Sequence, residues 1–127
     1  MRLRYLFVCF ALVPLATSAI AECLKANVEG QNAQGQLTVG RALDAAGRPE
    51  KPYILRLTSN VCLDADDPDE VVKNTRAIHV FPAEEKLEPT FRRLVGKTVA
   101  VRGNPFPAHT SHHHAPIVMQ VKEIQPR

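Results

Sequence analysis

Five short segments of the chain place apolar residues at alternate positions, a period of two that is typical of β-strands with one buried face. These segments cover residues 36–43, 52–63, 71–81, 97–106 and 116–124. Turn-forming residues separate them, above all in the DAAGRPEK stretch at 44–51. We expect residues 31–35 to be a polar lead-in and Gly40 to form a bulge within the first strand.

A helical period interrupts the strands between the third and the fourth. Apolar residues recur there on one helix face before the stop signal Gly96. These residues are Leu87, Phe91, Leu94 and Val95. Pro89 either begins the first turn of this helix or divides it. The order of elements predicts a mainly β fold, a small five-stranded OB-like Greek-key barrel with one short helix between strands 3 and 4. A small sandwich or an SH3-like barrel is the alternative.

Residues 1–21 have the pattern of a cleaved secretory signal peptide. Arg2 and Arg4 precede an apolar run of about ten residues, and small residues follow up to Ala21. The run is too short to span a bilayer. We expect cleavage between Ala21 and Glu22, which leaves residues 22–127 as a single domain in the periplasm or outside the cell.

Two cysteines, Cys23 and Cys62, remain once Cys9 leaves with the signal segment. In an oxidising compartment such a pair is expected to form a structural disulfide. Closing a loop of about 40 residues stabilises a fold by about 4 kcal/mol in the chain-entropy model. The bridge would hold the N-terminal segment against the second strand.

Charge and aromatic content argue against several classes of partner. The formal net charge of +3 falls to +1 when Arg2 and Arg4 are removed, so no basic field remains for nucleic acid or an anionic membrane. The few aromatic side chains predict no stacking platform for bases or sugars. No nucleophile elbow or glycine-rich phosphate loop occurs in the sequence either, and we expect a non-enzymatic protein.

The stretch PAHTSHHHAP at 107–116 holds four of the five histidines and connects the expected strands 4 and 5. In an OB-fold this connection, with the one between strands 1 and 2, flanks the usual binding face. Zinc and copper favour imidazole nitrogen as a ligand. In an extended segment two of the histidines point to one side and the one between them points away. We therefore predict a zinc or copper site formed by His109, His112, His113 and His114.

A polar loop without metal is the alternative for this stretch. Its imidazoles would then bond to backbone groups, Thr110 or Ser111, and their titration could make a contact depend on pH. His79 is expected to be a partly buried structural histidine. The acidic stretch at 64–70 lacks the glycine and the closing glutamate of a calcium loop, so we expect a solvated turn. Asp64 and Asp66 are the accessory candidates that could bring a carboxylate to the histidines.

Three stretches resemble the landmarks of DUF4431, a family of small exported bacterial domains of unknown function. They are VCLDADDPDE, LVGKTVAVRG and AHTSHHHAPIVMQV. The resemblance covers residues 23–124 and is most specific at 109–116. The chain departs from the family pattern at Ser111, where glycine is usual, and at Ala115, where threonine is usual. The resemblance implies export and the barrel architecture, and it implies no established activity.

These observations predict an exported, periplasmic or secreted binding module that is not an enzyme and whose histidine-rich connection contacts a ligand or a metal. The expected partner is a metal ion or a cell-envelope protein, with no nucleic acid and no membrane span after signal cleavage. The alternative is a protein–protein inhibitor or immunity protein that acts on a cell-envelope toxin or hydrolase. A third hypothesis is an enzyme that uses the histidines with a metal-bound water.

Overall fold

The computed structural model of the protein describes residues 8–14 and 23–127. Residues 8–14 have no regular secondary structure. The predicted signal peptide falls mostly outside the described residues, and its expected cleavage site lies outside them altogether. Within the described ranges, no helix is long and apolar enough to cross a membrane.

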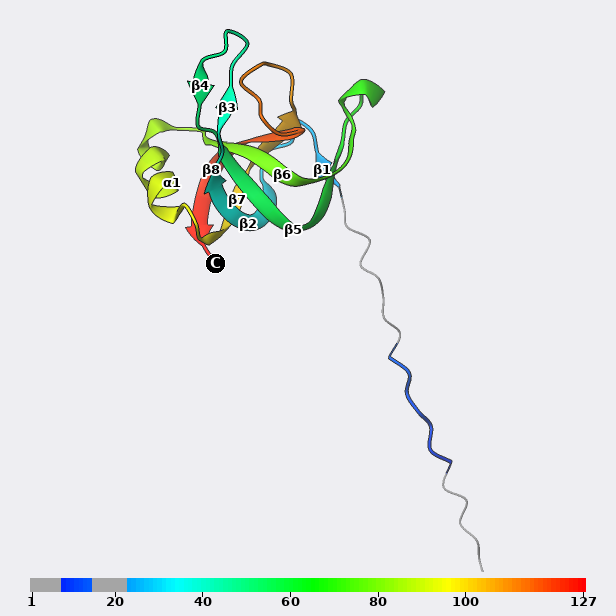
Figure 1. Ribbon diagram of the computed structural model, residues 1–127. Helices are drawn as coiled ribbons and strands as arrows, with labels where there is room; N and C mark the ends of the chain where they lie inside the picture. The colour runs from blue at the N-terminus through cyan, green and yellow to red at the C-terminus, as the bar shows by residue number, and fades with distance from the viewer. Residues whose placement is uncertain (1–7, 15–22) are drawn as a thin grey trace, which may run out of the picture.

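Five long strands close into a barrel (Figure 1). They are β2 (Gln31–Val39), β5 (Tyr53–Asp64), β6 (Val72–Pro82), β7 (Thr98–Pro107) and β8 (Ile117–Pro126). The strands are hydrogen-bonded in the order β5-β2-β7-β8-β6, and β6 returns to β5. Only the β6–β8 pair of this barrel is parallel. This is the strand order of an OB-type Greek-key barrel, so the predicted fold class is confirmed.

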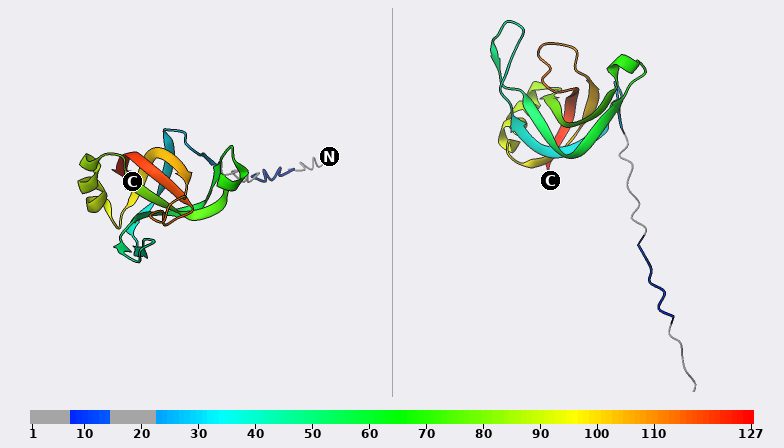
Figure 2. Two further views of the ribbon diagram at one scale, coloured as in Figure 1. Left: turned by 90° about the horizontal axis from the view of Figure 1, so that it is seen from above. Right: turned by 45° about the vertical axis from the view of Figure 1, so that its right-hand side comes forward.

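The remaining elements are short and precede or connect the long strands. They are β1 (Leu24–Lys25), β3 (Ala42–Leu43), β4 (Pro49–Glu50), the 3-10 turns η1 (Pro68–Glu70) and η2 (Glu85–Leu87), and the helix α1 (Glu88–Leu94). The β3–β4 hairpin, the β5–β6 turn and the β7–β8 connection all rise at one end of the barrel (Figures 1 and 2). We call residues 108–116, which join β7 to β8, the histidine loop.

The core is built from the inward positions of the five long strands and two side chains of α1. Phe91 and Leu94 of the helix are buried against it, and Pro89 stands in the first turn of α1, as one of the two expectations had it. Val95 is exposed, contrary to the helical pattern, because the backbone becomes extended at that residue. The completely buried strand residues are Leu37, Leu55, Leu63, Ile78, Val80, Val99, Ile117, Val118, Met119 and Val121.

The first long strand differs from its prediction at both ends. It begins at Gln31, so residues 31–35 are part of the sheet and pair with β7. Their polar residues do not show the apolar alternation of a strand: Asn32 and Gln34 are exposed, and the half-buried Gln31 is itself polar. Gly40 follows the strand and does not bulge it, and its N–H donates to the carbonyl of Pro52. Gly35 marks a close approach instead, since a Cβ there would lie 2.3 Å from the carbonyl oxygen of Arg56.

A disulfide joins Cys23 to Cys62, with their Cα atoms 4.6 Å apart. It ties the short strand β1 to the end of β5, with which β1 pairs in parallel. The predicted bridge is confirmed. It is consistent with an oxidising compartment.

Candidate functional site

The β3–β4 hairpin owes its shape to Asp44. Its carboxylate oxygen Oδ1 accepts the backbone N–H groups of Ala46 (2.9 Å) and Arg48 (2.8 Å), and Oδ2 accepts Nε–H of Arg48 (2.8 Å). Gly47 supplies the left-handed backbone that the turn requires. The backbone and side-chain bonds from Arg48 hold the pKa of Asp44 below its ordinary value. Asp44 is therefore a fixed anion, and its side chain is only 6% exposed.

The histidine loop is closed at its base and tightened at its tip. The N–H of Ala108 donates to the carbonyl of Pro116 (3.0 Å) at the base. At the tip, the N–H of His113 donates to the carbonyl of Thr110 (3.1 Å), and the N–H of His112 donates to the hydroxyl of Thr110 (3.2 Å). The loop thus has a defined turn at Thr110, and the three consecutive histidines follow this turn.

His113 points into the loop. Its Nδ1 accepts the backbone N–H groups of His109 (3.0 Å) and Thr110 (3.3 Å). Its ring packs edge-on against His109 and against Phe106 of β7, with centroids 4.7 Å and 5.4 Å apart. Burial is the main cause that lowers the pKa of His113. The ring is neutral at pH 7, with its proton on Nε2.

His79 of β6 holds the other end of the loop. Its Nδ1 accepts the backbone N–H of His114 (3.2 Å), and the two rings stack with centroids 5.8 Å apart. Burial and then the neighbouring His114 and His113 lower the pKa of His79 from 6.5 to about 4. The expected partial burial of His79 is confirmed, and the residue contacts the histidine loop through His114.

His112 and His114 both reach Glu50 of β4. His112 Nδ1 bonds to Oε1 of that carboxylate, and His114 Nε2 bonds to Oε2 at 2.5 Å. These bonds, that of His114 first, hold the pKa of Glu50 below its ordinary value. The side chain of Glu50 is 24% exposed, that of His114 14% and that of His112 62%.

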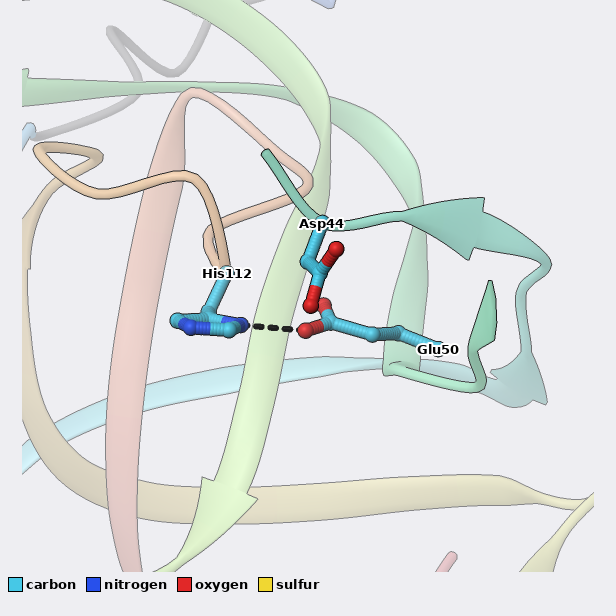
Figure 3. Close-up of side chains that lie close together, drawn as sticks. All are labelled: Asp44, Glu50 and His112. Atoms are coloured by element: carbon cyan, nitrogen blue, oxygen red, sulfur yellow. Dashed lines mark hydrogen bonds and ion pairs between the residues drawn. The ribbon is translucent and has the colours of Figure 1, made fainter. Parts of the chain in front are cut away.

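Asp44 completes this arrangement (Figure 3). One carboxylate oxygen each from Asp44 and Glu50 and one ring nitrogen of His112 all lie within 4.8 Å of one another. Two carboxylates from the hairpin thus face an imidazole from the loop, and a second imidazole, His114, adjoins the same Glu50. Oxygen and nitrogen ligands that converge in this way make a possible binding group for a divalent metal.

The structure separates the four predicted histidine ligands into two pairs. His112 and His114 face Glu50, whereas His109 and His113 pack together beside Phe106. His112 and His114 therefore face one partner and His113 another, but the segment turns at Thr110 and is not extended, and the four rings share no common partner. Metal binding by any of them remains a prediction.

The accessory candidates Asp64 and Asp66 lie elsewhere. They line a hollow beside Lys25 and Asn27, at the foot of the β5–β6 turn. The metal-competent group found in residues 8–14 and 23–127 includes neither of them. The carboxylates near the histidines come from the β3–β4 hairpin instead.

Asp44 and Glu50 were not among the residues predicted for the site. Both belong to the connection between the first two long strands, which looks in the sequence like a turn. That connection and the histidine loop flank the same face of an OB-fold. The acidic residues in the connection were therefore the sequence signal for carboxylate ligands near the histidines.

Comparison with known families identifies one match. The model of the family described as Domain of unknown function (DUF4431) matches residues 77–125, from the second half of β6 through α1 and the histidine loop to the end of β8. No curated protein matches the chain by sequence. The matched range includes His112 and His114 and leaves out Asp44 and Glu50. The predicted resemblance to DUF4431 is thus confirmed for residues 77–125, which contain all five histidines of the chain.

Proposed function

We propose that the protein is an exported, non-enzymatic binding module that holds a divalent transition-metal ion between the β3–β4 hairpin and the histidine loop. The observation that supports this proposal is the convergence of Asp44, Glu50 and His112, whose ligand atoms lie within 4.8 Å of one another. Zinc ligands of these types stand about 2.0–2.2 Å from the ion, so small inward shifts would complete coordination.

The ligand types favour zinc or copper. Imidazole suits these ions, whereas calcium and magnesium prefer shells made of oxygen alone. The lowered pKa values of Asp44 and Glu50 keep both carboxylates charged at neutral pH. Arg48 already pairs with Asp44, and His112 and His114 already bond to Glu50, so a divalent ion would add a further favourable charge between the two carboxylates.

The location of the candidate ligands, with His112 open to solvent, favours binding over catalysis. The candidate ligands lie on two protruding loops, and the side chain of His112 is 62% exposed. Catalytic metal sites keep reacting groups away from bulk water. The Cys23–Cys62 bridge and the apolar N-terminal run support export.

Calorimetric titration of the purified protein with zinc and with copper tests this function. We expect one ion per chain with a dissociation constant of about 1 μM or lower, and no comparable heat with magnesium. Glu50→Gln should weaken zinc binding by about tenfold or more, because the amide carries no charge. The matched control His109→Ala, on the same loop, should bind as the natural chain does. Absence of zinc and copper binding would contradict the proposal.

A second candidate function, a protein–protein inhibitor or immunity protein, is favoured by the surface beside the β5–β6 turn. Two hollows of about 530 and 540 Å³ there share Asn27 and Glu70. Their walls carry the carboxylates of Asp64, Asp66, Asp69 and Glu70. An acidic groove on a chain whose formal net charge is +1 once Arg2 and Arg4 are removed suits a basic segment of a partner protein.

Charge reversal tests this second candidate. Asp66→Lys together with Glu70→Lys should abolish any inhibition of a cell-envelope hydrolase, while Glu50→Gln should leave it intact. Loss of inhibition with the Glu50 variant alone would connect the activity to the metal site instead.

A further inference from the structure

We infer that His114 is the fourth ligand of the metal site, and that the bound ion cross-links the β3–β4 hairpin to the histidine loop as a closed, structural centre. This inference rests on the proposed metal-binding function. It specifies which residues bind the ion, and it states that the bound ion restricts the motion of the β3–β4 hairpin.

His114 is held through both its ring and its backbone. Its Nε2 lies 2.5 Å from Oε2 of Glu50, and its side chain is only 14% exposed. Its backbone N–H is anchored on Nδ1 of His79. The ring therefore approaches the candidate site from a fixed backbone position, beside the carboxylate that His112 approaches from the other side.

The hydrogen bonds of His79 and His113 make these two rings unsuitable as metal ligands. In each of them, Nδ1 already accepts backbone N–H groups of the loop. A metal at Nδ1 would displace those bonds, and a metal at Nε2 would require the proton to move to the nitrogen that now accepts them. Both rings therefore support the backbone on which His112 and His114 stand.

The proposed ligand set has two oxygens and two nitrogens. Asp44, Glu50 and His112 form the group whose ligand atoms lie within 4.8 Å of one another, and His114 joins them through its contact with Oε2 of Glu50. Four protein ligands fill a tetrahedral zinc shell, whereas catalytic zinc sites keep one position open for water or substrate. Two hydrogen bonds that now run from imidazole N–H groups to Glu50 would be replaced by bonds to one ion.

Filling this site joins two segments that are far apart in sequence. Glu50 is separated from His112 by 62 positions and from His114 by 64. The β3–β4 hairpin forms a small sheet of its own outside the barrel sheet, and it rises beside the histidine loop (Figures 1 and 2). Because the barrel ladder does not hold the hairpin, a metal bridge through Asp44 and Glu50 should restrict its motion most.

Electron paramagnetic resonance of the full chain loaded with one equivalent of Cu²⁺ tests the ligand count. The natural protein should show hyperfine coupling to two imidazole nitrogens, and His114→Gln should show one. His109→Gln, a matched change on the same loop, should keep two. Coupling to one nitrogen in the natural protein, or an unchanged spectrum in His114→Gln, would overturn the role of His114 while leaving metal binding in place. Free Cu²⁺ without any protein-bound signal would remove the proposed function itself.

Hydrogen exchange with and without zinc tests the cross-link. Zinc should slow amide exchange at residues 42–50 and 108–116 by about tenfold in the natural protein and in His109→Gln, and by much less in His114→Gln. Equal protection in His114→Gln would contradict the clamp. Far-ultraviolet circular dichroism of each variant verifies that the barrel is folded.

Discussion

Replacement of His79 by glutamine should remove part of the acid sensitivity of the fold. Burial is the main cause that lowers the pKa of His79 from 6.5 to about 4, followed by the nearby His114 and His113, while Glu50 opposes the shift. In the unfolded chain the ring regains its ordinary pKa. Below pH 6.5 the unfolded state therefore binds a proton that the native state does not bind, and the free energy of unfolding falls as the pH drops toward 4.

The size of this loss follows from the two pKa values. Without solvent screening, a shift from 6.5 to about 4 lowers the free energy of unfolding by about 2 kcal/mol when the pH falls from about 7.5 to about 5. Because His79 is only half buried, solvent screening reduces the expected loss to about 1 kcal/mol. Urea unfolding with a chelator present, at both pH values, measures it. The natural protein should lose about 1 kcal/mol more than His79→Gln on acidification, and His109→Gln should behave as the natural protein does. Equal losses in the natural protein and His79→Gln would show that protonation of His79 does not destabilise the fold in acid.

Three further perturbations test the barrel by urea unfolding. Phe91→Ala empties a fully buried position between α1 and the strands and should lower the free energy of unfolding by about 3–5 kcal/mol; a loss below about 1 kcal/mol would contradict its place in the core. Gly35→Ala sets a Cβ 2.3 Å from the carbonyl oxygen of Arg56 and should cost more than about 2 kcal/mol, because the backbone itself must move. The cysteines of the Cys23–Cys62 bridge are 39 positions apart, and its reduction should lower the free energy of unfolding by about 4 kcal/mol. An unchanged urea midpoint would show that the bridge does not restrict the conformations of the unfolded chain.

Much of the fold can be predicted because a barrel strand has one face in the core and one in water. That alternation places Val99, Val101, Ile117 and Met119 inside, where they are buried. It fails at the start of β2, where polar residues pair with β7 through backbone groups and no apolar alternation marks the strand. The parallel pairing of β6 with β8 depends on chain closure and leaves no local pattern in either strand.

The candidate site is only half visible in the sequence. The clustering of histidines draws attention to His112 and His114, which both reach Glu50 in the structure. Glu50 reaches them only after the barrel has closed, from more than 60 positions away. The acidic residues of the hairpin mark it as a candidate, but the approach of Glu50 to the histidines depends on the closed barrel. The tautomers that exclude His79 and His113 as ligands likewise follow from backbone bonds that only the folded loop makes.

The most direct measurement is the position of zinc in a crystal of the zinc-loaded protein, located by anomalous scattering at the zinc edge. We expect one strong peak between the β3–β4 hairpin and the histidine loop, about 2.0–2.2 Å from ring nitrogens of His112 and His114 and from carboxylate oxygens of Asp44 and Glu50. A peak beside His109 and His113, or none between the hairpin and the loop, would contradict it.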